Sequence, residues 1–367
     1  VLAFSVFVTT LVTIFYLSTY LEQGMEALFS FLLTTPLCLL HKLLAWSPFL
    51  QQTLVGTVNN GVIDFESAMG LFSTGLYIPL GQVAPPVIAF YSIMGLLEDS
   101  GYLPRLALVA DNLMHRYALH GVAIMPMLLG AGCNVTGIIG TRVLDKRRQR
   151  IITATLLSIA IPCTSQTGFI MAMTSRMGGW LTALLFVTLI AVWHLLGLVF
   201  GSHEKHNYQE MVMEIPPLRR PRLRPSLHKL WYRARDFLED AIPITIIGIG
   251  ILLVLNYFSI LALLGRTVFS FLNTLWGLPH QVIPALFMGL FRKEIALSFL
   301  KMIPNLTPAQ AFISTLILTL WFPCISVYTI LYKEFGLATL GRLVALMFGL
   351  STTIGILFHM LLSTFAS

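Results

Sequence analysis

Apolar runs long enough to cross a lipid bilayer recur along the whole chain, separated by short polar or basic segments. A membrane-spanning helix needs about 20 mostly apolar residues. Runs approaching or exceeding this length cover residues 1–21, 71–97, 151–173, 180–200, 241–260, 280–300, 308–332 and 338–362. The pattern predicts an all-α protein, a polytopic bundle of transmembrane helices.

Residues 22–70 interrupt this pattern. The piece 28–46 is moderately apolar but contains Pro36 and Lys42, and the polar segment 51–67 follows it. An amphipathic helix in the membrane interface has such a mixture. We therefore expect 22–70 to lie mostly outside the bilayer, with spanning of 28–46 as the alternative.

Composition and charge agree with a membrane protein. The chain is 56% hydrophobic and only 11% charged, whereas soluble domains are about 25% charged. The net charge of +7 is concentrated in loops, which indicates topology and lipid contact rather than nucleic-acid binding. The basic stretches 142–150 and 202–240 are expected in the cytoplasm.

The apolar run that begins at residue 122 ends in an unusual stretch, 130–142, with four glycines, a thiol and an amide. Glycine loosens a helix, and irregular backbone at membrane depth is tolerated only inside protein or beside a watery cavity. Transporters bind their substrates at such broken helices. We expect Cys133 and Asn134 to meet a cation there, with a small-residue packing face as the alternative. The glycines that would permit the break are Gly130, Gly132 and Gly137.

Two segments repeat one pattern, a polar break followed by Pro-Cys inside a spanning run. The first contains Pro162 and Cys163, and the second contains Pro323 and Cys324. A proline inside a helix frees the carbonyl four residues earlier. The freed carbonyls belong to Ser158 and Thr319. Two such kinks in matching context predict duplicated gating units.

The basic loops constrain how these units cross the membrane. If the chain enters from the cytoplasm, segment 122–141 must start and finish inside, because 142–150 is basic. A re-entrant hairpin that folds back at the glycines keeps both ends of this segment on the cytoplasmic side, and the second gate then opens from the outside. We prefer inverted repeats, and two parallel repeats follow if 28–46 also spans. Four parts result. They are an N-terminal helix with an external or interfacial segment (1–70), a first gate repeat (71–200), a basic cytoplasmic loop (201–240) and a second gate repeat (241–367).

Several ionisable side chains lie in or beside the apolar runs, where they mark functional sites by default. Glu98 and Asp99 end a span and could attract or pass a cation, with interfacial solvation as the alternative. Glu294 could be a ligand or could pair with a basic neighbour. We expect His115 and His120 at the surface.

The residues resemble a known family at four places. These are the string Leu96-Leu97-Glu98-Asp99-Ser100-Gly101-Tyr102, the string Gly132-Cys133-Asn134-Val135, the basic turn after Thr141-Arg142, and Arg292-Lys293-Glu294 followed by Phe322-Pro323-Cys324. From about residue 70 onward the chain resembles the membrane domain of the ferrous iron transport protein B family. It departs from the family pattern at Thr136, where Pro is common, and at Gln166 and Gly168, where Arg and Pro are common.

The resemblance implies import of Fe²⁺ as the transported substrate, with no tightly bound cofactor, across a prokaryotic inner membrane. It implies a cytoplasmic GTP-binding domain, small accessory iron-transport proteins and a homo-oligomer. The sequence contains no Gly-x-x-x-x-Gly-Lys-Ser/Thr phosphate loop. We therefore expect no enzyme activity here, and a GTPase on a missing segment or another chain. The first residue, Val rather than Met, suggests a fragment.

Thiol chemistry suits the implied substrate, because Fe²⁺ accepts thiolate, imidazole and carboxylate ligands. Cys133, Cys163 and Cys324 would favour iron over magnesium or calcium. A single buried cysteine is more often an inert apolar side chain, but the matched set favours function. A nucleoside or other small-solute transporter with the same gates is the alternative, and a non-transporting membrane assembly protein is a third hypothesis.

Overall fold

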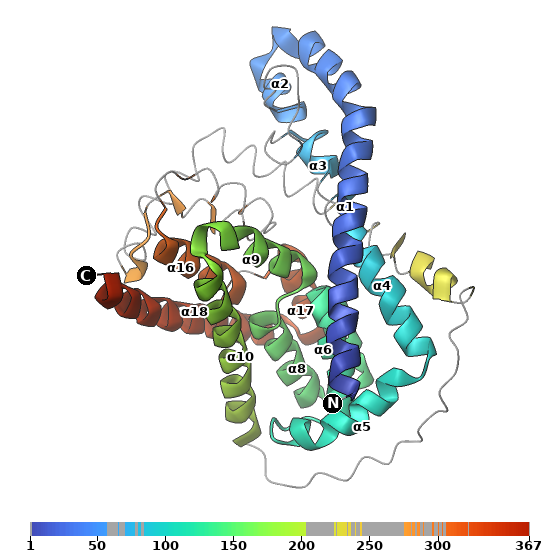
Figure 1. The fold of residues 1–367 in the computed structure, drawn as a ribbon, viewed down its shortest axis with the longest axis vertical. Coiled ribbons are helices and arrows are strands. Elements are labelled where there is room, and N and C mark those ends of the chain that lie inside the picture. Colours follow the sequence, from blue (N-terminus) through green and yellow to red (C-terminus); the bar gives the residue numbers. More distant parts are fainter. Residues whose placement is uncertain are drawn as a thin grey trace. The chain divides into compact units, whose positions relative to one another are not determined.

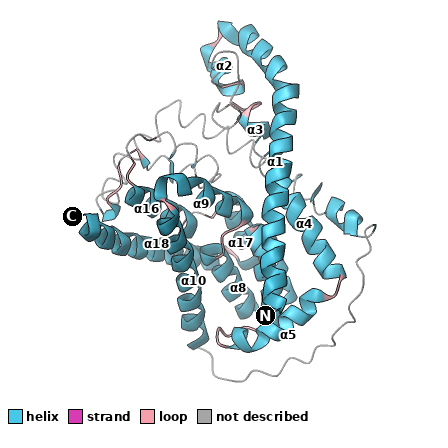
Figure 2. Ribbon diagram, viewed as in Figure 1, coloured by secondary structure: helices cyan, strands magenta, loops and turns pink. Residues whose placement is uncertain are grey.

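The computed structural model describes most of the chain. The described residues are 2–56, 65, 70–77, 80–81, 84–202, 224, 226–232, 234–235, 239, 243, 275–279, 281–282, 285–286, 289, 296, 300, 303, 306–321 and 323–366. All regular elements within them are helices (Figure 2), which confirms the all-α prediction. By packing, the chain forms unit 1, Val1–Leu96 with Arg222–Thr267, and unit 2, Leu97–Pro221 with Val268–Ser367. These units are defined by which residues pack together and not by internal repeats, so the predicted repeat boundaries stay a prediction.

Unit 1 is dominated by one long helix, α1 (Leu2–Leu43). The helix end that we expected at residue 21 is wrong, because Glu and Gln near that point are good helix formers and one Gly costs only about 1 kcal/mol. Its part Tyr16–Leu43 is long and apolar enough to cross a membrane. Ranges 1–21 and 28–46 therefore share one helix almost entirely and do not form two separate helices.

Shorter helices follow α1 along the chain: η1 (Leu44–Trp46), α2 (Pro48–Leu54), α3 (Thr74–Tyr77) and α4 (Ala84–Asp99), whose last residues belong to unit 2. An aromatic cluster packs α1 against them, with the Phe29 and Phe65 rings each 5.5 Å from the Tyr77 ring. The predicted span 71–97 contains α3 and the 16-residue α4, and residues 78, 79, 82 and 83 between them lie outside the described part of the chain.

Unit 2 contains the remaining described helices (Figure 1). In its first half they are α5 (Tyr102–His115), η3 (Gly121–Ala123), α6 (Ile124–Gly132), α7 (Asn134–Gly140), η4 (Thr141–Val143), α8 (Arg147–Ala160), α9 (Thr164–Met177) and α10 (Gly179–Ser202). In its second half they are α16 (Pro308–Leu320), α17 (Ile325–Phe335) and α18 (Leu337–Ala366). Most residues of the predicted runs 241–260 and 280–300 lie outside the described residues.

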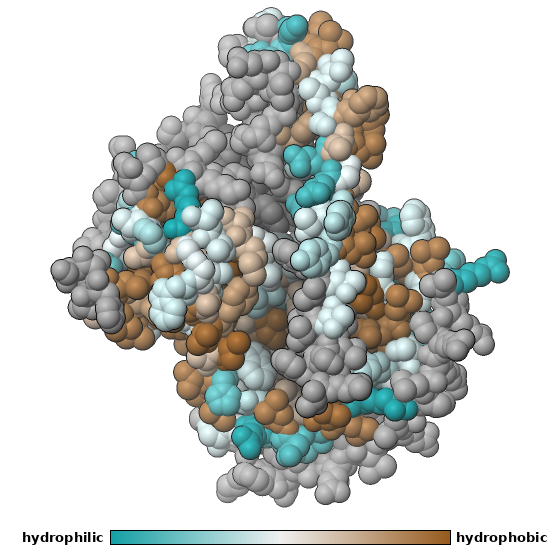
Figure 3. Space-filling model, viewed as in Figure 1, coloured by the Kyte–Doolittle hydropathy of each residue, from teal (hydrophilic) through white to brown (hydrophobic). Residues whose placement is uncertain are grey.

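Within the described ranges, five stretches are long and apolar enough to cross a membrane. Besides Tyr16–Leu43 they are Arg147–Met177, Gly179–Ser202, Pro308–Phe335 and Leu337–Leu362. Hydrophobic side chains reach the surface of the molecule (Figure 3). On α10, Ile190 is 67% exposed and Leu195 is 61% exposed, as a surface facing lipid requires. The chain is therefore a multi-pass membrane protein.

Helices α6 and α7 fold back on each other around Cys133, whose backbone is extended (φ −148°, ψ 119°). The ends of α6 and α7 that lie away from Cys133 form the base of this hairpin. They pack together, since a Cβ on Gly140 would be 3.5 Å from the Pro126 Cβ. A Cβ on Gly137 would be 2.6 Å from the Gly130 Cα. The predicted fold-back is confirmed, and Gly130 and Gly137 also form a close packing contact.

We expect Gly137→Ala to lower the free energy of unfolding by about 1–3 kcal/mol, because a methyl group forced against backbone cannot be relieved by a rotamer change. Thermal unfolding of the purified chain in detergent measures the loss. Gly168→Ala is the matched control, since a Cβ at Gly168 meets nothing within 4 Å. Equal melting temperatures for the two variants would contradict the close packing of the hairpin.

The two Pro-Cys spans, α8–α9 and α16–α17, run antiparallel. At one end Arg147 Nη2 donates to the carbonyl of Phe335, the last residue of α17, at 3.3 Å. At the other end Arg176 Nη1 donates to the carbonyl of Ile303, shortly before α16, at 3.0 Å. This antiparallel pairing is the arrangement that inverted repeats require.

Candidate functional site

Each of the three cysteines in unit 2 occupies the N-cap of a half-helix. Cys133 precedes α7, Cys163 precedes α9 and Cys324 precedes α17. The sequence predicted kinks at Pro162 and Pro323, but the structure has complete breaks there, between Ala160 and Thr164 and between Leu320 and Ile325. Proline lacks a backbone N–H and drives the preceding residue toward extended backbone, so the helix stops rather than bends.

Cys133 precedes α7, and α7 packs against α17, the helix that Cys324 precedes. One apolar cluster contains Val135 and Ile138 of α7, Val327 of α17 and Cys324. All three cysteines are half-buried. The fold thus brings the first thiol of the hairpin toward the thiol of the second Pro-Cys break.

Asn134 presents a buried polar atom at the break beside Cys133. Its side chain is 3% exposed, and within the described part of the chain its Oδ1 is buried without a hydrogen-bond partner. Leaving such an acceptor unpaired costs about 1–3 kcal/mol. A buried oxygen of this kind in a native fold is suited to accept a hydrogen bond from water or to bind a cation. Asn134 directly follows Cys133, so both predicted ligands lie at the start of α7.

Gln166 connects the two Pro-Cys breaks and was missed as a site residue. Its Oε1 accepts the Cys163 backbone N–H at 3.1 Å, and its Nε2 donates to the Thr319 carbonyl at 3.4 Å. The residue is 2% exposed. Thr164 adds a weaker link from this break to the hairpin tip, through its Oγ1 and the Ala131 carbonyl at 3.4 Å. A polar residue three positions after an N-cap is a capping signal that the sequence did contain.

The hydroxyl groups expected at the breaks donate hydrogen bonds to carbonyls within their own helices. Ser158 Oγ donates to the Ala154 carbonyl and Thr319 Oγ1 to the Thr315 carbonyl, both at 2.8 Å. The freed carbonyl of Thr319 is engaged by Gln166. The thiols and the Asn134 amide are therefore better candidates for metal ligands than these hydroxyl groups.

The predicted acidic ligands are placed differently. Glu294, with Arg292 and Lys293, lies outside the described residues. Glu98 is exposed and Asp99 half-buried at the end of α4. Among the described residues, the His, Cys, Asp and Glu side chains form one group of three whose ligand atoms are close enough to share an ion, namely Asp111, His115 and His120. The three thiols do not form a second group of this kind.

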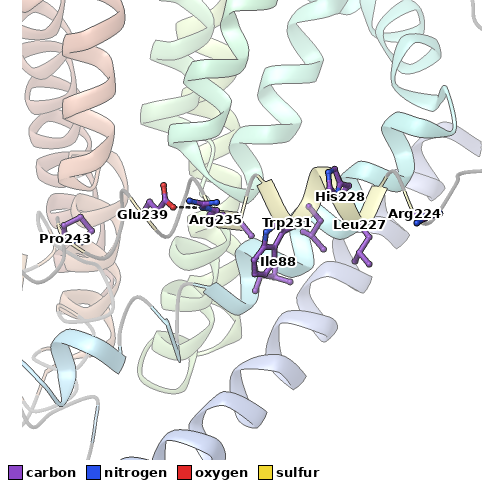
Figure 4. A pocket seen from close by; sticks show the side chains of 10 residues that line it. Ile88, Arg224, Leu227, His228, Trp231, Arg235, Glu239 and Pro243 are labelled. Atoms are coloured by element: carbon purple, nitrogen blue, oxygen red, sulfur yellow. Dashed lines mark hydrogen bonds and ion pairs between the residues drawn. The ribbon is translucent and has the colours of Figure 1, made fainter.

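A cavity of about 830 Å³ in unit 1 lies beside the described part of the basic loop (Figure 4). Leu227, Leu230 and Trp231 line it, and Arg235 Nε and Glu239 Oε1 form an ion pair at 2.6 Å on its wall. None of the predicted metal ligands lines this cavity, so we do not assign the ion path to it.

Comparison with known proteins finds two family matches. The chain matches the Gate family, described as nucleoside recognition, over residues 80–177 and 238–338. It also matches the C terminus of ferrous iron transport protein B over residues 182–233. No solved structure was found to match it.

Curated relatives carry iron-transport names. The chain is 25% identical over 331 residues to the Fe(2+) transporter FeoB of Methanocaldococcus jannaschii, covering 78% of this chain and 48% of the relative. It is 27% identical over 257 residues to the Fe(2+) transporter FeoB of Synechocystis, covering 66% and 42%.

A third relative, from Porphyromonas gingivalis, is named an Fe(2+) transport protein A/Fe(2+) transporter FeoB fusion protein. It is 28% identical over 212 residues, covering 56% of this chain and 25% of the relative. The chain thus spans half or less of the length of these relatives. The two Gate segments and the segment between them account for most of the chain, in the order that the resemblance implied. The chain belongs to the ferrous iron transport protein B family and represents its membrane portion.

Proposed function

We propose that this chain carries Fe²⁺ across a prokaryotic inner membrane, along a path in unit 2 that passes Cys133, Asn134, Cys163 and Cys324. The observation that carries the proposal is the buried, unpaired Asn134 Oδ1 beside Cys133. The names of the curated relatives support iron as the substrate.

The proposed chemistry depends on thiolate charge. The N-terminus of a helix carries partial positive charge, so the half-helices headed by Cys133, Cys163 and Cys324 would repel a bare cation. Thiolates offset that repulsion, and metal binding to thiols releases protons. Soft sulfur donors also separate Fe²⁺ from Mg²⁺ and Ca²⁺, which prefer oxygen. Iron is the substrate here, with no resident cofactor proposed.

The remaining roles are proposals that follow from the family. Glu98, Asp99 and Glu294 attract or pass the cation. A cytoplasmic GTP-binding domain controls the gates, and no GTPase chemistry is assigned to these 367 residues. A small accessory iron-transport protein acts with the transporter, in keeping with the name of the fused relative. The protein works as a homo-oligomer in the lipid bilayer.

Uptake of radioactive Fe²⁺ into proteoliposomes tests the proposal, with Mn²⁺, Zn²⁺ and uridine as competitors. We expect uptake above that of empty liposomes, inhibition by transition-metal ions and no inhibition by uridine. Since nucleoside recognition is the description of the Gate family, uridine uptake without iron uptake would instead support the nucleoside alternative. Absence of iron uptake, also after a GTP-binding domain is supplied, would contradict the proposal.

A further inference from the structure

The end of α5 brings together three side chains with metal-binding chemistry. Asp111 and His115 lie one turn apart on the helix and therefore share a face. The chain then reverses at Ala118, whose φ of 59° is left-handed, and places His120 beside them. Both histidines were expected at the surface, and all three side chains are half-buried. Their ligand atoms lie within 4.8 Å of one another.

The distances in this group fit ligands of one ion. His115 Nε2 lies 3.5 Å from Asp111 Oδ2 and 3.4 Å from His120 Nδ1. Hydrogen bonds of N–H groups are usually about 2.9–3.0 Å long. Two ligands of a tetrahedral ion, each about 2.1 Å from the metal, are roughly 3.4 Å apart. The two distances from His115 therefore match the separation of neighbouring ligands around a shared metal.

The carboxylate is oriented by a second contact. Asp111 Oδ1 accepts the backbone N–H of Gly121 at 2.6 Å, which leaves Oδ2 directed at His115. Outer hydrogen bonds of this kind fix the ligands of protein metal sites. We propose that Asp111, His115 and His120 bind one divalent transition-metal ion through two imidazole nitrogens and one carboxylate oxygen. This donor set suits Fe²⁺, Co²⁺ or Zn²⁺ better than Mg²⁺ or Ca²⁺, and it leaves positions for exchangeable water.

The group lies at the base of the α6–α7 hairpin, whereas Cys133 lies at its tip. His120 directly precedes η3 and α6, and Gly140 of α7 returns to the same base. The nine residues of α6 separate base and tip by roughly 14 Å. The C-terminal end of α10 is also at this base, because a Cβ on Gly201 would be 3.3 Å from the Tyr117 Cα. The site is thus separate from the thiols, next to the basic turn 142–150.

Its role rests on the proposed function. The basic turn 142–150 and the loop after α10 are both expected in the cytoplasm. An ion at Asp111, His115 and His120 has then already passed the thiols. The site binds iron that is leaving the transport path toward the cytoplasm. Transfer to a cytoplasmic acceptor is easier from imidazole and carboxylate ligands than from thiolates.

Titration of the purified chain with Co²⁺ tests the site, because the ligand-field absorption of Co²⁺ reports coordination and thiolate ligation adds separate charge-transfer bands. We expect a ligand-field component without sulfur bands, in addition to any thiolate bands from the cysteines, and this component should survive in Cys133→Ser. His115→Ala and His120→Ala should each weaken this binding at least about tenfold. Asn112→Ala is the matched control, as Asn112 is exposed on the same helix.

A Co²⁺ spectrum that is unchanged in both histidine variants, or no Co²⁺ binding by the wild-type chain, overturns the site. If a histidine variant loses its melting transition, Asp111→Asn replaces it, since the amide keeps an acceptor for Gly121 and removes the charge. Uptake is scored separately in proteoliposomes. Uptake combined with a Co²⁺ spectrum indifferent to the histidines refutes the site alone, whereas the expected spectrum without uptake refutes the proposed function.

Discussion

Cys133→Ser is expected to lower the initial rate of Fe²⁺ uptake into proteoliposomes by at least about tenfold. Loss of a mere outer-shell partner already costs about 10–100-fold in metal affinity or activity, and Cys133 is proposed as a direct ligand. Ser has nearly the same volume as Cys and is well tolerated at membrane helix contacts. The melting temperature should therefore change little, which separates loss of a ligand from loss of the fold.

Cys38→Ser is the matched control for this prediction. Cys38 is also half-buried, but it packs in the apolar cluster of unit 1 around Phe29 and Tyr77. Its replacement should leave uptake unchanged. In the wild-type chain, Fe²⁺ should also slow labelling of Cys133 by a maleimide. Normal uptake by Cys133→Ser, together with labelling that iron does not affect, would show that Cys133 contributes only to packing.

Gln166→Leu should reduce both uptake and stability, because it removes the side chain that joins the two Pro-Cys breaks. The change leaves the Cys163 N–H and the Thr319 carbonyl without the partners they have in the native fold. An unpaired buried polar group costs about 1–3 kcal/mol. We expect a lower melting temperature and an uptake rate reduced several-fold, measured on the same detergent-purified and reconstituted preparations.

The chain contains a matched glutamine at an equivalent helix start. Gln310 forms the capping box at the N-terminus of α16 with Thr307, and its Nε2 donates to the Gly277 carbonyl at 3.2 Å. Gln310→Leu therefore removes the same kind of cap without touching a Pro-Cys break. It should lower stability but leave uptake per folded molecule near normal. Equal losses of uptake in the two variants would rule out a special role for Gln166.

Much of this fold could be predicted from the sequence, because apolar length and Gly or Pro placement act locally. The break at Cys133 and the breaks beside Pro162 and Pro323 were located by such local signals. The end of the first helix was misplaced, since polar residues within a good helix-forming stretch do not stop a helix. The sequence thus indicated where helices could break more reliably than where they would continue.

Contacts between distant segments were the part that the sequence could not supply. The partner of Gln166, Thr319, is 153 positions away, and nothing local distinguishes one freed carbonyl from another. His120 reaches Asp111 only because Ala118 adopts a left-handed conformation, which its residue type disfavours. A sequence pattern specifies the chemistry of such side chains but not the turn that brings them together.

Three hydrogen bonds join the antiparallel spans α8–α9 and α16–α17 along their length, so the two spans form one mechanical unit. Arg147 bonds to Phe335 at one end, Arg176 to Ile303 at the other end, and Gln166 to Thr319 in the middle. The spans cannot slide past each other or separate without breaking at least one of these bonds. A motion that opens a passage must therefore move both spans together as a rigid body, or must first break the hydrogen bond between Gln166 and Thr319 beside Cys163.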